Sequence, residues 1–278
     1  MSKHKRLVLG LVPGGAARWC GPGGEWRQTL PKILETFDNS FLISTASATY
    51  VFTEFMFEHV GKDRLFLDSG GYSLFCKESK LGADTEEFHK ACEKMRKKFL
   101  KLLNYSEFDT IFELDNEYFR KDEDLLSPKN YCRQEVKDAT GSYPTPVFKM
   151  HQGFQYWKDL CESDLYPTLA IGGLAPTRSW HVHKEELVNM VSYARQHKKK
   201  VHLLGCRNVE TARAVQPDTV DYDISLYAVN FALARKEYPD LPANDPVFYK
   251  CMAAHAFASA RSRSFLYDTL GNDEENNN

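Results

Sequence analysis

Short apolar runs rich in β-branched and aromatic residues recur along this chain, and stretches with helical spacing separate most of them. Runs of this kind, bounded by glycine or polar residues, are typical of buried strands. The predicted strands are Leu7–Val12, Phe41–Ile43, Leu65–Leu67, Thr110–Leu114, Val147–Met150, Leu169–Ile171, Val201–Leu204 and Thr219–Tyr222. The clearest predicted helices are Val51–Glu58, Thr85–Leu103, Tyr156–Ser163, Lys184–His197 and Val209–Val215.

This alternation of strands and helices predicts an α/β protein. Eight strands with intervening helices between Leu7 and Tyr222 are the pattern of a (β/α)8 TIM barrel, with a doubly wound open sheet as the alternative. We expect one barrel domain over residues 1–270 and a disordered tail over residues 271–278, because that tail is polar and low in complexity.

Polar residues and glycines follow most of the predicted strands directly. In a barrel these positions meet at the carboxyl rim, where active sites lie. The side chains and glycines concerned are Asp68, Asp115, His151-Gln152-Gly153, Gly172-Gly173, Gly205 and Asp223. A helix cap would explain Asp68 alone, but it does not explain the whole set. The sequence therefore predicts a functional site at this rim.

Two segments interrupt the repeat and are predicted to be insertions at the same rim. Residues 13–24 form a glycine-rich loop with Arg18 and Trp19, which lacks the spacing of a phosphate loop or a dinucleotide fingerprint. It is either a plain long loop or a mobile lid over a ligand. Residues 119–146 are charged and contain prolines, and we interpret them as an insertion that could contact a large substrate.

Composition narrows the functional class only a little. The formal net charge is −2, which neither indicates nor excludes a nucleic-acid partner. Seven scattered cysteines without a Cys-x-x-Cys pair argue against a disulfide framework and a cysteine-rich zinc site. No apolar stretch approaches the roughly 18 residues of a membrane span. We expect a soluble, cytoplasmic protein with free thiols.

The residue types at the rim match two kinds of chemistry. Paired carboxylates can act as nucleophile and proton carrier in glycosyl transfer. Asp68, Asp115 and Gln152 could also pair with the edge of a purine, and Tyr72 could stack on its face. Three aspartates could instead hold Mg²⁺, although the spacing does not require it.

Six motifs between residues 65 and 228, in family order, resemble those of the tRNA-guanine transglycosylase superfamily. The chain is most similar to the compact, zinc-less, phage-type members that modify DNA with 7-deazaguanine bases. The motifs are Asp68-Ser69-Gly70-Gly71-Tyr72, Leu114-Asp115, His151-Gln152-Gly153, the segment 170–175 (Ala-Ile-Gly-Gly-Leu-Ala), Leu203-Leu204-Gly205 and the segment 222–228 (Tyr-Asp-Ile-Ser-Leu-Tyr-Ala).

The resemblance implies an exchange of guanine in DNA for a 7-deazaguanine derivative through a covalent aspartyl-glycosyl intermediate. It implies Asp223 as the nucleophile and Asp68 as the acid/base. The implied partners are DNA, free deazapurine base and, in a dimer, a second copy, with the host cytoplasm as location for a bacteriophage protein. Alternatives are the same exchange on tRNA and a non-catalytic nucleic-acid-binding subunit. The implied substrate-binding residues are Ser69, Tyr72, Asp115, Gln152, Gly172, Gly173 and Leu174.

Three departures from the family pattern affect the details. Ser73 replaces a family glutamine and Leu204 a stacking methionine, so the pocket differs. The zinc module, a Cys-x-Cys-x-x-Cys with a distant histidine, is absent, so we expect no metal or cofactor. Cys251 and His255 have the i, i+4 spacing of one helix face, but no partners are evident in the sequence, and we interpret them as ordinary helix residues.

Overall fold

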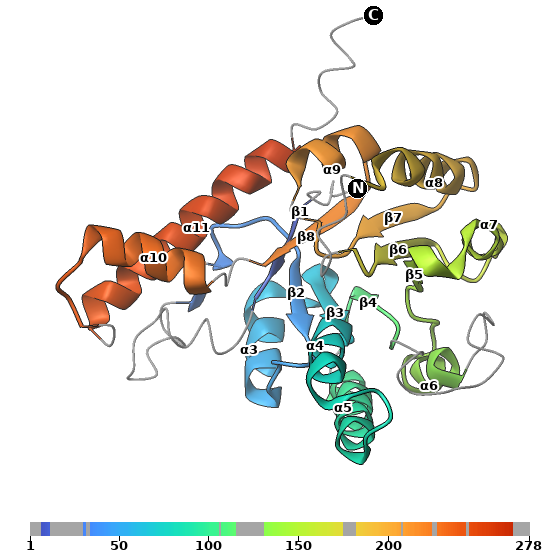
Figure 1. The fold of residues 1–278 in the computed structure, drawn as a ribbon, viewed down its shortest axis with the longest axis horizontal. Coiled ribbons are helices and arrows are strands. Elements are labelled where there is room, and N and C mark those ends of the chain that lie inside the picture. The colour runs from blue at the N-terminus through green and yellow to red at the C-terminus, as the bar shows by residue number, and fades with distance from the viewer. Residues whose placement is uncertain are drawn as a thin grey trace, which may run out of the picture.

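The computed structural model describes residues 7–11, 30–31, 34–105, 107–114, 131–174, 182–206, 208–223, 227–242 and 245–268. Eight parallel strands alternate with helices in these ranges (Figure 1). The strands are β1 (Leu7–Gly10), β2 (Phe41–Ser44), β3 (Leu65–Asp68), β4 (Thr110–Ile111), β5 (Val147–Lys149), β6 (Thr168–Gly172), β7 (Lys200–Leu203) and β8 (Thr219–Asp223). The helices are α3 (Tyr50–Val60), α4 (Gly71–Leu81), α5 (Glu86–Tyr105), α6 (Tyr131–Thr140), α7 (Phe154–Glu162), α8 (Lys184–Gln196), α9 (Val209–Val215), α10 (Tyr227–Glu237) and α11 (Pro246–Asp268), with short 3₁₀ turns η1 (Lys62–Arg64) and η3 (Met150–Gln152).

The strands form one curled sheet in the order β4-β3-β2-β1-β8-β7-β6-β5. Its two edges meet at a parallel bridge between Phe112 and Thr145. There the Thr145 N–H donates to the Ile111 carbonyl at 2.7 Å, and the Glu113 N–H donates to the Thr145 carbonyl at 3.0 Å. The fold is thus a TIM-barrel-like α/β fold, as predicted, and the open-sheet alternative is wrong.

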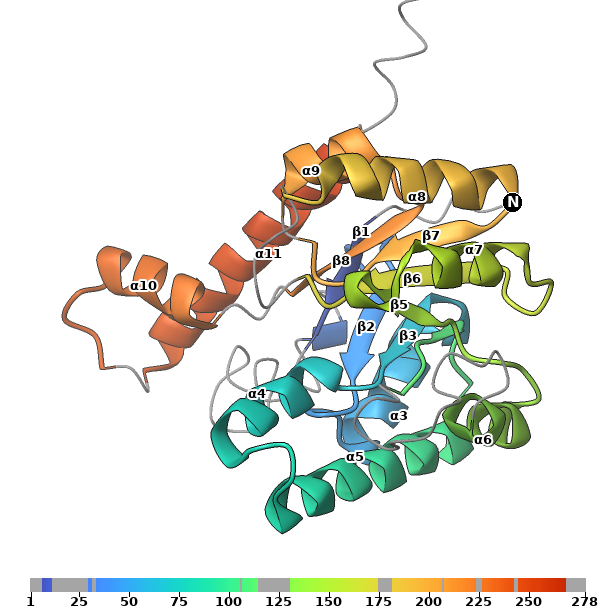
Figure 2. The ribbon, with the colours of Figure 1, turned by 45° about the vertical axis from the view of Figure 1, so that its right-hand side comes forward.

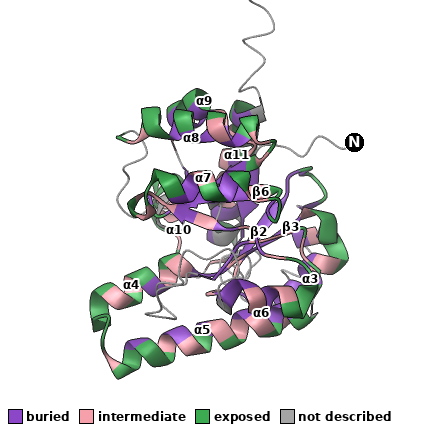
Figure 3. Cartoon of the chain, turned by 90° about the vertical axis from the view of Figure 1, so that its right-hand side faces the viewer, coloured by how far each residue is buried: buried purple, intermediate pink, exposed green. Residues whose placement is uncertain are grey.

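Strand side chains alternate between two apolar layers, as the period of two in a strand requires. One set meets inside the barrel in a small cluster, and the other packs under the helices in the main core. Figure 3 shows the buried residues on the strands and on the helix faces turned toward them. The buried inner cluster consists of Val8, Leu42, Phe66, Phe112 and Ala170.

A buried ion pair fixes the junction at which the barrel closes. Glu113 Oε2 accepts from Arg133 Nε, and both side chains are almost fully buried. Glu113 Oε1 accepts the Val147 N–H at 2.6 Å, and Arg133 Nη2 donates to the Tyr156 hydroxyl at 2.7 Å. Burial by itself lowers the pKa of Arg133, but the charge and hydrogen bond of Glu113 raise it above its ordinary value.

The helix that carries Arg133 lies within the predicted insertion over residues 119–146. In the described part of that segment, α6 occupies the position of a helix between β4 and β5. Its sequence is largely polar, and Cys132, Arg133 and Val136 are buried against the barrel. Residues 119–130, the glycine-rich segment 13–24 and the tail 271–278 lie outside the described residues.

Helices α10 and α11 form a hairpin after the last strand. It projects from one side of the barrel (Figures 1 and 2). Ala234, Phe248 and Met252 form a small buried core within it, while α11 also packs against β1 and α9. In the part of the chain that the structure describes, no helix has both the length and the apolar character needed to cross a membrane.

Candidate functional site

The pleat of β3 places Asp68 on the inner face of the barrel at its carboxyl end. Leu65 and Leu67 belong to the outer core and Phe66 to the inner cluster. Asp68, two residues after Phe66, therefore points to the same side as Phe66. Ser44 at the end of β2 is its register partner, so a hydroxyl and a carboxylate lie side by side at this rim.

The backbone around Asp68 is held by local hydrogen bonds. Asp68 Oδ2 accepts the Gly70 N–H at 3.1 Å. The Asp68 carbonyl accepts from the Thr45 N–H at 2.9 Å and from Thr45 Oγ1 at 2.7 Å. The helix cap considered from the sequence does not form, because the residue that caps α4 is Gly70, in left-handed conformation and without a side-chain cap.

Gly70 is required at this turn for two reasons, which a pair of variants can separate. Its φ of +88° is left-handed, and a Cβ there would lie 3.1 Å from both Ala46 N and Met95 Sδ. Gly141 has a similar φ of +82° with nothing within 4 Å of a Cβ. We expect Gly141→Ala to cost about 1–2 kcal/mol of unfolding free energy from backbone strain. Gly70→Ala should cost about 1–3 kcal/mol more from overpacking, as measured by urea denaturation. Equal losses would contradict the packing argument.

Two strands from β3 around the closed sheet, β5 presents a lysine at the same rim that sequence reasoning missed. Phe148 packs in the outer core and Val147 against the inner cluster, so the alternation turns Lys149 inward. The stem of Lys149 lies beside Gly173, since a Cβ on that glycine would be 3.4 Å from Lys149 Cγ. The signal was available in the sequence, because Lys149 is two residues after the inward Val147 within a predicted strand.

The glycine pair after β6 shapes the rim next to Lys149. A Cβ on Gly172 would lie 2.8 Å from Val147 Cγ1, and Gly173 has a φ of +78°. The backbone at Gly172–Gly173 therefore approaches β5 closely, and a side chain at either position would disturb that contact. Gln152, predicted to bind substrate, accepts the Lys149 N–H at 2.8 Å through Oε1 and so also closes the turn after β5.

Below the rim, a polar group occupies the barrel interior between β7 and β8. His202 Nε2 lies 3.2 Å from Asp221 Oδ1, and His202 Nδ1 lies 2.8 Å from Thr219 Oγ1. Asp221 Oδ1 also accepts the Gly205 N–H at 2.5 Å. Through these hydrogen bonds the buried Asp221 carboxylate fixes the loop after β7. Neither His202 nor Asp221 was predicted from the sequence.

The other predicted site residues have different surroundings. Ser69 and Leu174 are buried, whereas Tyr72 on α4 is 64% exposed. Asp223 ends β8 with its Cα opposite that of Gly10, while its side chain and all of Asp115 lie outside the described residues. The structure thus brings Asp68, Gln152 and Gly172–Gly173 to one rim, and the roles predicted for the whole set stay predictions.

Comparisons with known proteins identify similar structures. No family model and no curated protein matches this chain. One similar structure is a protein from Coccidioides immitis described as a fructose-1,6-biphosphate aldolase. It is 13% identical to this chain with a TM-score of 0.56, and the match covers 98% of this chain and 92% of that protein. The YdjI aldolase of Escherichia coli K12 is 11% identical to this chain with a TM-score of 0.51, and the match covers 98% of this chain and 94% of that protein. At this identity the likeness establishes the fold.

The comparison corrects the predicted activity. Guanine transglycosylation through Asp223 and Asp68 was predicted, but the similar structures are aldolases, and this prediction is wrong. The prediction relied on short motifs around Gly70 and Gly173. Both glycines have a positive φ, so the turns at this barrel rim require them for their backbone conformation, whatever the reaction. The family resemblance itself, and the expected partners DNA, tRNA, free base and a second copy, are tested by neither comparison and stay predictions.

Proposed function

We propose that this chain is an enzyme of the aldolase type, which breaks or forms the bond between the α and β carbons of a β-hydroxy carbonyl compound. Lys149 would form an imine with the carbonyl carbon, and Asp68 would carry the proton. One observation carries the proposal: the strand pleat aims both side chains at the inner face of the carboxyl rim. The two aldolases with a similar fold support the reaction class, and the roles of Lys149 and Asp68 rest on their position.

An electron sink is the first requirement of this reaction. Cleavage leaves an electron pair on the carbon next to the carbonyl, and a protonated imine accepts that pair more readily than a ketone does. Lys149 is a strand lysine that the pleat turns toward the inner face of this rim, and its amine can form such an imine. The neighbouring Gly173, without a Cβ, leaves room for the lysine stem.

The proposed steps balance without an oxidant or reductant. Neutral Lys149 Nζ attacks the carbonyl carbon. The carbonyl oxygen takes one proton from the amine and one from solvent and leaves as water, which gives a protonated imine. The Asp68 carboxylate takes the proton of the β-hydroxyl, the α–β bond breaks, and an aldehyde leaves while the electron pair forms an enamine. Asp68 returns the proton to the α carbon, and water hydrolyses the imine to release the ketone and Lys149. This final hydrolysis returns one proton to solvent.

Trapping of the imine tests this proposal. Incubation with fructose 1,6-bisphosphate, the compound named for one similar structure, followed by borohydride reduction, should add the trapped ketone fragment to the peptide that contains Lys149. Mass spectrometry of the digested protein measures this adduct. Lys149→Met should abolish it, because the variant removes the only nucleophile of the proposed step.

A second lysine provides the matched control. Lys200 is also a strand residue, but it begins β7 and so lies at the opposite, amino end of the barrel. Lys200→Met should therefore keep the adduct at the wild-type level. An adduct that survives Lys149→Met, or a complete lack of adduct with bisphosphorylated and unphosphorylated ketoses, would overturn the proposal.

A further inference from the structure

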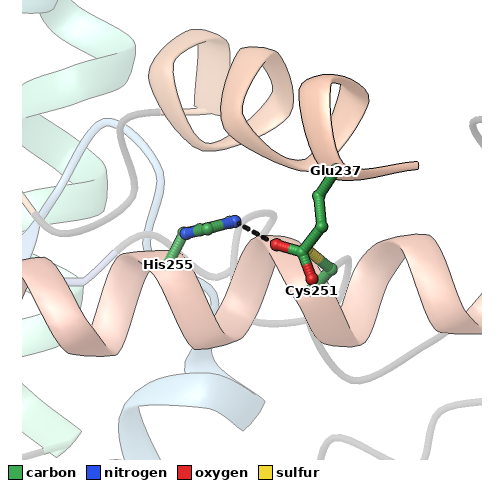
Figure 4. Close-up of side chains that lie close together, drawn as sticks. All are labelled: Glu237, Cys251 and His255. Atoms are coloured by element: carbon green, nitrogen blue, oxygen red, sulfur yellow. Dashed lines mark hydrogen bonds and ion pairs between the residues drawn. The ribbon is translucent and has the colours of Figure 1, made fainter. Parts of the chain in front are cut away.

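We propose that Glu237, Cys251 and His255 form a zinc site that clamps α10 to α11, independently of the reaction at the barrel rim. Glu237 is the last residue of α10, and Cys251 and His255 lie one turn apart on the facing side of α11 (Figure 4). One ligand atom of each side chain lies within 4.8 Å of the others. No other group of three such residues occurs in the described ranges.

The distances fit a tetrahedral ion. Zinc binds sulfur at about 2.3 Å and nitrogen or oxygen at about 2.0–2.1 Å, so its tetrahedral ligand atoms lie roughly 3.3–3.6 Å apart. His255 Nε2 is 3.2 Å from Glu237 Oε2, and Cys251 Sγ is 3.5 Å from the same oxygen. Small side-chain rotations would therefore be enough to place an ion between the three atoms.

The donor set favours zinc over the other common ions. A thiolate and an imidazole are ligands that zinc prefers, whereas Mg²⁺ and Ca²⁺ prefer oxygen. Burial, followed by the hydrogen bond and negative charge of Glu237, raises the pKa of the Cys251 thiol. A divalent cation at this point would oppose that effect and favour the thiolate.

The position gives the ion a structural role. The hairpin has only a small core of its own, formed by Ala234, Phe248 and Met252. Arg235 Nη1 donates to the Leu241 carbonyl at 2.6 Å and so fixes the chain where it leaves α10. Zinc at Glu237, next to this turn, would join the end of α10 to the middle of α11. Glu237 is exposed and the other two ligands are half-buried, so water can take the fourth position.

Spacing in the sequence could not show this site. Cys251 and His255 are separated by one helical turn, a spacing that is common without a metal, and the third ligand is 14 residues before Cys251 on another helix. From the sequence we expected no metal, because the chain lacks a multi-cysteine module. The hairpin supplies the missing partner through its fold.

Zinc titration of the whole protein tests the site. After removal of metal by a chelator, the wild-type chain should bind one zinc ion per molecule at micromolar concentration. Cobalt in its place should give the absorption band of a thiolate ligand. Loss of an outer-shell partner typically weakens metal binding about 10- to 100-fold, so Cys251→Ser and His255→Ala should each cost more than roughly 100-fold. Hydrogen exchange should slow in α10 when zinc is added.

His183 provides the matched control. Its Nδ1 lies 3.2 Å from Glu186 Oε2 on α8, which gives the same imidazole–carboxylate pairing, but in the described ranges the pair does not belong to a group of three metal-ligating side chains. His183→Ala should leave the zinc affinity unchanged, and circular dichroism should show that all variants are folded. Zinc binding that survives both Cys251→Ser and His255→Ala, or no binding by the wild type, would overturn the proposal.

Discussion

Glu113→Gln should lower the free energy of unfolding by about 3–5 kcal/mol, because it leaves the Arg133 guanidinium buried without a countercharge. Arg133 is 1% exposed and Glu113 is 4% exposed, so water cannot replace the lost partner. Folded domains are stable by only about 5–15 kcal/mol, and this single change should therefore remove a large share of the total. Urea denaturation followed by circular dichroism measures the loss.

An exposed ion pair between a basic side chain and a glutamate provides the control. Lys62 and Glu107 pair at the surface, where their side chains are 67% and 75% exposed. Glu107→Gln should change the free energy of unfolding by less than about 1 kcal/mol. The double variant Glu113→Gln/Arg133→Met should lose less than the sum of its single variants. Similar losses for Glu113→Gln and Glu107→Gln would contradict the role assigned to the buried pair.

The strands and five of the helices could be predicted because their apolar spacing is local and strong. The predicted strand Leu65–Leu67 and the predicted helix Lys184–His197 each agree with the structure to within one residue. Such elements bury a regular apolar face, and this face is visible in the sequence without knowledge of the fold.

Helices α4 and α6 were not predicted, because their stability depends on tertiary contacts. Only Leu74 of α4 is buried, so the helix lacks a clear apolar stripe. In α6 the decisive buried side chain is Arg133, whose burial depends on Glu113, which follows β4 and lies 20 residues earlier in the sequence. Most helix stability in proteins comes from packing of this kind rather than from local preference.

The sequence predicted that Asp68 and the glycines after β6 meet at one rim, but it did not predict Lys149 beside them. Asp68 and the glycines after β6 follow strands directly, and a barrel brings such ends together. Lys149 was missed because only residues after the strands were considered, whereas the pleat also aims the last strand residue inward. The chemistry was wrongly predicted because glycine-containing turns report the backbone conformation of a rim and not the reaction performed there.

Asp68→Asn should lower kcat about 10²- to 10⁴-fold, the range typical for loss of a general acid/base. The amide oxygen of asparagine can still accept the Gly70 N–H, which Asp68 Oδ2 accepts at 3.1 Å, so the turn and the stability should be preserved. The rate of aldehyde release, measured with the ketose that labels Lys149, shows the loss. The imine on Lys149 should still form and be trapped by borohydride.

Asp68→Ala separates the structural role of this side chain from its chemical role. Alanine removes both the proton carrier and the acceptor for Gly70, so this variant should lose activity and also about 1 kcal/mol of stability from the broken hydrogen bond. If Asp68→Asn keeps the wild-type rate while Asp68→Ala is only destabilised, Asp68 is a turn residue without a part in catalysis. A trapped imine with slow aldehyde release places Asp68 in the step after imine formation, because bond cleavage needs the carboxylate to accept the β-hydroxyl proton and imine formation does not.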